Sequence, residues 1–160
     1  MSTRVKVPAG TRKGPVHLRF DDGVVFVTAQ DSDRFLVAAK KAVEALQRVT
    51  ELDRVVDLFS EEYLPRLHDW CLEHQNKLAA CFVSPPRGAS LVVFVVGKTN
   101  QYDFEFGKLI SQLELDLEDL GWPSDVLQLP SGDDEELRTF FNPEQALQIY
   151  AESQPTSGES

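Results

Sequence analysis

The chain is poor in cysteine and in long apolar runs, and it has few basic residues for its length. Two Cys among 160 residues are too few for a disulfide framework or a cysteine-based zinc cage. The longest apolar run, residues 91–96, is far shorter than the ~20 residues of a membrane-spanning helix. Sixteen Lys and Arg against 26 Asp and Glu give a formal net charge of −10, which disfavours nucleic-acid binding by the whole protein. We therefore expect a cytoplasmic protein that has no cofactor and contacts no membrane.

The remaining composition is typical of a globular domain. Strongly hydrophobic residues make up 42% of the chain, enough for a self-supporting core. We expect one globular domain over residues 1–152, because no repeat and no low-complexity linker interrupts it. Residues 153–160 lack large apolar side chains and are expected to form a flexible tail.

Turn signals and apolar runs predict two hairpins. Asp22 and Gly23 tolerate the positive φ angles of a type I′ turn between strands at residues 16–20 and 24–28. Strands at 79–84 and 91–96 should flank a five-residue loop with two prolines at its start. Because residues 91–96 are apolar throughout, both faces of that strand should be covered, and it should lie centrally in the sheet.

Apolar residues at three- and four-residue steps predict the helices. Two or three helices should lie between residues 33 and 77, and Pro65, which lacks a backbone N–H, should interrupt or kink this region. A further helix should begin near residue 104 and end at Gly121, which accepts the left-handed conformation of a helix cap.

The last third of the chain predicts one short strand and two more helices. The strand should cover residues 126–129. Acidic residues from Asp133 onward suit the N-terminal end of a helix that runs to Phe141. Asn142 followed by proline is a strong helix-start signal, and this final helix should extend to about residue 152.

From residue 24 onward the elements follow the order βαββαβ of a ferredoxin-like unit, whose first and third strands are central. The strands at 24–28 and 91–96 are apolar on both faces, which fits those positions. A strand at 16–20 would compete for an edge of the strand at 24–28. We therefore predict a variant: a layered α+β domain with a mainly antiparallel sheet of about five strands, an added N-terminal strand and C-terminal helices.

Charge is unevenly distributed along the chain. Residues 1–20 carry five basic residues and no acid, whereas residues 101–160 carry fourteen acids and two bases. We interpret the acidic part as a helical surface of a non-catalytic protein-binding or adaptor domain, whose basic partner would bind less tightly as salt rises. The residues assigned to this surface are Glu114, Glu118, Asp119, Asp133, Asp134, Glu135 and Glu136. A surface that serves only solubility is the plainer interpretation. An open sheet edge at the last strand or the first hairpin would add self-association as a homo-oligomer.

The alternative is an enzyme or small-ligand-binding domain with a site assembled from residues distant in sequence, because local catalytic motifs are weak. Gly97, Lys98 and Thr99 follow a strand, but Val92 stands where a phosphate loop needs its first glycine, so we exclude that loop. A third hypothesis assigns anion or nucleic-acid contact to the basic N-terminal arm, with Arg12 and Lys13 as anion-binding residues.

One short segment carries weak candidates for a metal site. His68, Cys71 and His74 recur at three-residue steps on an expected helix, so adjacent pairs would face one ion. Their spacing matches no standard ligand pattern, and cysteine is commonly a small buried hydrophobe. We therefore predict no metal site. A nucleophilic Cys–His pair is disfavoured as well, because no loop suited to an oxyanion hole is evident.

Overall fold

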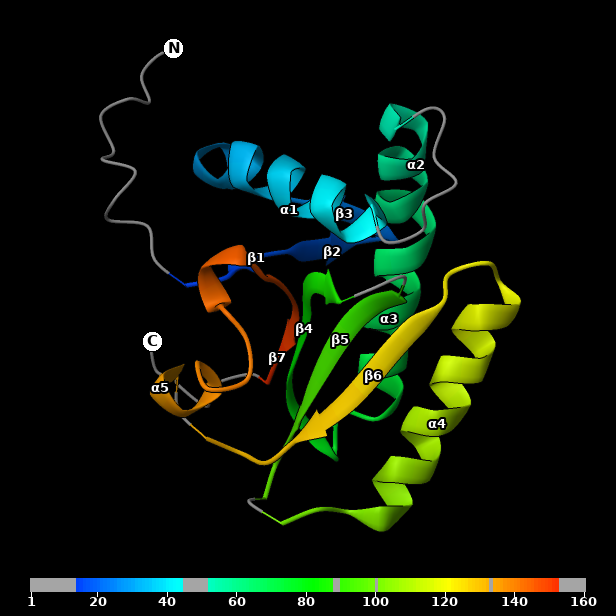
Figure 1. Ribbon diagram of the computed structural model, residues 1–160, viewed down its shortest axis with the longest axis vertical. Helices are drawn as coiled ribbons and strands as arrows, with labels where there is room; N and C mark the ends of the chain where they lie inside the picture. The colour runs from blue at the N-terminus through cyan, green and yellow to red at the C-terminus, as the bar shows by residue number, and fades with distance from the viewer. Residues whose placement is uncertain (1–13, 45–51, 88–89, 100, 133, 153–160) are drawn as a thin grey trace.

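The computed structural model describes residues 14–44, 52–87, 90–99, 101–132 and 134–152, and the structural statements below refer to these (Figure 1). A five-stranded sheet has the order β1-β7-β4-β5-β6, and a separate sheet pairs β2 with β3. The strands are β1 (Val16–His17), β2 (Arg19–Asp21), β3 (Val24–Phe26), β4 (Leu78–Arg87), β5 (Ser90–Gly97), β6 (Ser124–Leu129) and β7 (Leu147–Ala151). The helices are α1 (Ser32–Glu44), α2 (Leu52–Leu58), α3 (Leu64–Glu73), α4 (Phe104–Asp119) and α5 (Asp134–Leu137), with short helical segments at Ala29–Asp31, Phe59–Tyr63 and Pro143–Gln145.

The fold is α+β, but its sheet is mixed, which corrects the mainly antiparallel sheet that we expected. β4 pairs antiparallel with β5 and with β7, whereas β5 with β6 and β1 with β7 pair in parallel. Among the described strands of this sheet, four therefore run in one direction and β4 runs in the other. α4 supplies the long crossover that two parallel neighbours such as β5 and β6 require.

The strand expected at 24–28 is not central in the main sheet, so the ferredoxin-like strand order is not found among the described strands. Asp22 (φ 56°) and Gly23 (φ 78°) do form the expected type I′ turn, and this tight turn fixes β2 as the neighbour of β3. Val24 and Phe26 are 52% and 45% exposed. The hairpin instead packs on the protein through its other face, where Phe20 stacks on His68 of α3 with ring centroids 4.1 Å apart.

The final helix expected from residue 142 to residue 152 is wrong. Asn142 does accept a hydrogen bond from the backbone N–H of Glu144, but the helical turn that follows is only three residues long. From Leu147 onward the side chains alternate between buried and half-buried, and Leu147 and Ile149 enter the core. This period of two is that of a strand, and β7 pairs with both β1 and β4.

Two other expected boundaries are also corrected. The helix expected to reach Phe141 ends at Leu137, and Phe141 instead stacks on Phe94 of β5 with ring centroids 4.9 Å apart. The strand expected to stop before the two prolines continues to Arg87, which pairs with Ser90. A register shift between residues 84 and 87 accommodates the prolines, which have no N–H to donate.

Several local predictions are confirmed. The described residues between 33 and 77 form α1, α2 and α3, as predicted. Pro65 does not break the helical path, however, because a π-helical segment leads directly into α3 and Pro65 lies in the first turn of that helix. α4 ends as predicted, because Gly121 (φ 92°) donates its N–H to Glu118 and Trp122 donates to Leu117, the pattern of a Schellman cap. β6 covers the strand expected at 126–129.

Two apolar clusters lie on the two faces of the sheet. The large core contains side chains of α1, α3 and α4 together with Leu91, Val93 and Val95 of β5. The small core contains Val92, Phe94 and Val96 of β5, with residues 137 and 141 from the segment after β6. β5 is therefore buried on both faces and lies inside the sheet, as predicted. In Figure 1, α4 and α5 lie on opposite sides of the strands.

Candidate functional site

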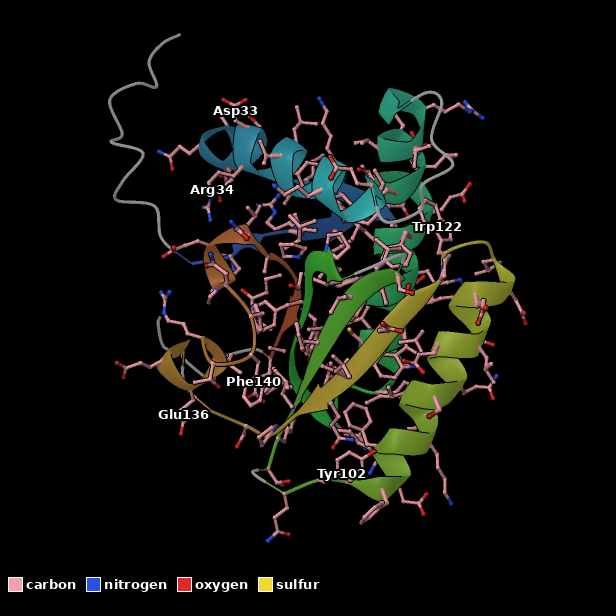
Figure 2. All side chains as sticks on the ribbon, viewed as in Figure 1. Asp33, Arg34, Tyr102, Trp122, Glu136 and Phe140 are labelled. Carbon is pink, nitrogen blue, oxygen red and sulfur yellow. The ribbon has the colours of Figure 1, made fainter. Side chains whose placement is uncertain are left out.

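The structure does not bring together all the acidic residues that we assigned to one partner surface. Glu114, Glu118 and Asp119 lie at the C-terminal end of α4, whereas Glu135 and Glu136 lie on α5. α4 packs on the large core and α5 on the small core, so the two groups lie on opposite faces of the sheet. Figure 2 shows Glu136 on the other side of the molecule from Trp122, which follows α4. Asp133 and the side chain of Asp134 lie outside the described part of the chain.

Glu114 has a structural contact at the edge of the sheet. Its Oε2 atom accepts a hydrogen bond from the backbone N–H of Val126 in β6 at 2.7 Å. β6 is an edge strand, and this N–H would otherwise be open to another chain. Self-association through β6, which remains a prediction, would have to displace the Glu114 carboxylate.

The C-terminal end of α4 presents both acidic and apolar side chains to solvent. Glu118 and Asp119 are exposed, and neither takes part in any ion pair found among the described residues. Leu115 and Leu120 beside them are 57% and 51% exposed. We call this surface the acidic end of α4 and define it by Leu115, Asp116, Glu118, Asp119 and Leu120.

The three weak metal-site candidates on α3 face different surroundings. His68 stacks on Phe20, His74 packs on Trp70 with ring centroids 4.8 Å apart, and Cys71 is buried. A hydrogen bond with Cys81 and then burial hold the pKa of the Cys71 thiol well above its usual value, which keeps it protonated and a poor nucleophile. Within the described ranges, no group of three or more His, Cys, Asp or Glu side chains is arranged to hold a metal ion.

A polar hollow of about 110 Å³ lies at the carboxyl ends of β5 and β6. Its polar side chains come from the turn before β4, the loop after β5, the start of α4 and β6; they are Asn76, Lys77, Lys98, Thr99, Gln101, Asp103 and Gln128. We call it the carboxyl-edge hollow. Tyr102, labelled in Figure 2, marks its loop at the start of α4.

Asp103 organises one wall of the carboxyl-edge hollow. Its carboxylate caps α4 by accepting the N–H of Phe106 at 3.0 Å, and it accepts a hydrogen bond from Lys77 at 3.3 Å. The bond from the Phe106 N–H is the main reason that the pKa of Asp103 is lowered. The backbone of Asp103 exchanges two hydrogen bonds with the Gln128 amide, at 2.9 and 3.2 Å. These contacts tie the start of α4 to β6 and to the turn before β4.

A second hollow, of about 260 Å³, lies between α1 and the turn at residues 143–145. Arg34 stands in its wall and is held by Asp31 at 3.1 Å, by the carbonyl of Gly14 and by the carbonyl of Glu144 at 3.3 Å. This arginine therefore links three segments of the chain, and its hydrogen bonds account for its presence without a ligand. Arg12 and Lys13, the predicted anion-binding residues of the N-terminal arm, lie outside the described residues.

Sequence reasoning missed the carboxyl-edge hollow because its residues are spread from position 76 to position 128. One usable signal was present: Gly97, Lys98 and Thr99 follow a buried strand, and Asp103 then begins a helix. That order is typical of a parallel crossover, whose loops gather at the carboxyl ends of the strands.

Comparisons with protein-family models, with curated proteins and with solved structures returned no match for this chain. Among the helices of the described residues, none has the length and apolar character to span a membrane.

Proposed function

We propose that this domain is a non-catalytic binding module that engages a basic protein segment through the acidic end of α4. The main support for this proposal is the position of the acidic residues in α4. Asp116, Glu118 and Asp119 lie in the last turn of α4, which has no basic residue. Carbonyl groups give this end of a helix a partial negative charge, so each acid there costs about 0.3–1 kcal/mol rather than stabilising the helix. Helix stability therefore does not account for them, and a positively charged partner would.

The exposed leucines specify the partner further. Leu115 and Leu120 flank the acids, and an exposed apolar patch rimmed by polar residues is typical of a protein interface. A partner segment that alternates basic and apolar residues would contact both the acidic side chains and the exposed leucines. The proposal includes a cytoplasmic location, which is supported by two buried, unbridged cysteines, Cys71 and Cys81.

The test uses a synthetic helical peptide built from lysine and leucine, with binding measured by fluorescence anisotropy at several salt concentrations. The wild-type chain should bind, and its affinity should fall as salt rises. The double variant Glu118→Lys/Asp119→Lys should bind about fivefold to thirtyfold more weakly, since two charge contacts of about 0.5–1 kcal/mol each are lost. Leu120→Ser should weaken binding equally at low and at high salt.

A matched control separates local recognition from net charge. Glu61 and Glu62 are exposed neighbours in the π-helical segment, so Glu61→Lys/Glu62→Lys changes the net charge by the same amount. The control should keep the wild-type affinity within about twofold. Equal losses in the two double variants would mean that the peptide senses only total charge, and the proposal would be rejected. Loss on reversing Glu135 and Glu136 alone would reject it too, in favour of α5.

A further inference from the structure

The carboxyl-edge hollow lies at a position where open sheets commonly bind ligands. β5 and β6 are parallel neighbours. The chain leaves β5 toward α4 on the large-core face, and it leaves β6 toward α5 on the small-core face. Connections that diverge to opposite faces leave a crevice outside the carboxyl ends of the strands, and this crevice is the usual ligand position in such sheets. The hollow opens at that point.

The lining is more basic than the protein as a whole. Among the lining residues, Lys77 and Lys98 contribute two positive charges and Asp103 one negative charge, whereas Glu152, the carboxylate partner of Lys98, lies outside the lining. In contacts among the described residues, neither lysine ammonium uses all three of its hydrogen-bond donors. Lys77 makes one hydrogen bond of 3.3 Å, and an ammonium has three donors. Lys98 Nζ lies 3.7 Å from Glu152 Oε1, which is longer than a hydrogen bond.

The floor and two walls of the hollow are tightly packed and hydrogen-bonded. Phe106 is buried beneath it and stacks on Trp70 with ring centroids 5.8 Å apart and nearly parallel planes. The paired hydrogen bonds between Asp103 and Gln128 hold two of its walls together. Preformed walls lower the ordering cost that a ligand must overcome on binding.

We infer that the carboxyl-edge hollow binds a small oxyanion, a single phosphate or carboxylate group, through Lys77 and Lys98, in place of the carboxylates that these lysines contact in its absence. The volume of the hollow and the lack of a glycine-rich phosphate loop limit the class of ligand. About 110 Å³ admits one such group, and the missing first glycine leaves no loop to wrap a polyphosphate. The N-terminus of α4 is not the binding element, because Asp103 already caps it. At the rim, the Thr99 hydroxyl donates its proton to the Gln101 carbonyl at 3.1 Å, so the neutral donor offered there is the side-chain amide of Gln101.

The experiment titrates the full chain with three probes, inorganic phosphate, glycerol phosphate and acetate, at constant ionic strength maintained with sodium chloride. Binding is followed by amide chemical shifts in NMR spectra. Shifts that saturate at Thr99, Gln101 and Asp103 support the inference, and the strongest probe identifies the ligand as a phosphate, a phosphate ester or a carboxylate. If none of the probes produces a saturable shift at these residues, the inference is wrong.

Two matched variants test the lysine assignment. Lys98→Gln should weaken binding of the strongest probe about tenfold or more, because hydrogen bonds to charged groups contribute about 1.5 kcal/mol or more. Lys108→Gln removes the same charge from an exposed position on α4 outside the hollow and should change the affinity less than about twofold. Equal losses of affinity in both variants would show that the probe responds to overall charge and not to a specific site, and would overturn the inference. Unchanged thermal unfolding of Lys98→Gln confirms that the fold is retained.

Discussion

A buried chain of hydrogen bonds links Tyr63, Ser124 and Trp122. It predicts that Tyr63→Phe lowers stability in the wild-type protein but raises it when Ser124 has already been replaced by alanine. Ser124 Oγ lies 2.9 Å from the carbonyl oxygen of Trp122 and 2.8 Å from the Tyr63 hydroxyl. A serine hydroxyl has one proton, which Ser124 donates to the Trp122 carbonyl, so Tyr63 must donate its own proton to Ser124. Tyr63 is almost inaccessible, and burial raises the pKa of its phenol above the usual range, which keeps that proton in place.

The two single substitutions should differ in cost. Tyr63→Phe removes one donor while Ser124 keeps its bond to Trp122, so the free energy of unfolding should fall by about 1 kcal/mol. Ser124→Ala leaves both the Tyr63 hydroxyl and the Trp122 carbonyl without a partner. Since each of the two buried groups left without a partner costs about 1–3 kcal/mol, this variant should lose about 2–6 kcal/mol of unfolding free energy.

Adding Tyr63→Phe to Ser124→Ala should reverse the sign of the tyrosine substitution. The phenylalanine removes a hydroxyl that is already unpaired, so the double variant should regain about 1–3 kcal/mol over Ser124→Ala alone. Urea unfolding followed by far-ultraviolet circular dichroism measures all four proteins, provided that the slope with urea stays constant. If Tyr63→Phe lowers stability equally in both backgrounds, the hydroxyl has another partner and the assigned direction of donation is wrong.

Two further predictions concern the sheet edge and the packed hairpin. Glu114→Ala should lower the free energy of unfolding by about 1–2 kcal/mol and Glu114→Gln by less, because the amide oxygen still accepts the Val126 N–H; urea unfolding distinguishes them. Burial lowers the pKa of His68, opposed by nearby Asp69, so the unfolded chain binds more protons as the pH falls below about 6.5. The free energy of unfolding should therefore decrease as the pH is lowered from about 6.5 to the folded-state pKa of His68. His68→Phe keeps the stack on Phe20 and should abolish this pH-dependent loss of stability. If the variant shows the same pH profile as the wild type, His68 does not cause the loss.

The elements that the sequence predicted well depend on short-range chemistry. The type I′ turn at Asp22 and Gly23 requires only residues that accept positive φ. The end of α4 likewise depends on Gly121 and the hydrogen bonds of the adjacent turn. The burial of both faces of β5 followed from a continuous apolar run. Each of these signals lies within a few residues of the feature that it predicts.

The errors arose where tertiary pairing decided between local alternatives. Asn142 and Pro143 are a genuine helix start, and the structure contains that helical turn. The helix does not continue because the next residues pair as a strand between β1 and β4, in which Leu147 and Ile149 are buried as alternate residues. The direction of the strands depends on the same long-range pairing, so no local sequence pattern could predict that the sheet is mixed.

The candidate sites show why charge along a sequence is a weaker guide than charge in space. Acids that look like one run from residue 114 to residue 136 are divided by β6 into two groups on opposite faces of the sheet. Lys77 and Lys98 are isolated in sequence, yet the antiparallel pairing of β4 and β5 brings Leu78 opposite Gly97, and therefore brings the two lysines to one edge. The same sheet that separates the acids thus gathers these bases. A basic segment at the acidic end of α4 and an oxyanion at the carboxyl-edge hollow would accordingly bind at separate places, and neither should compete with the other.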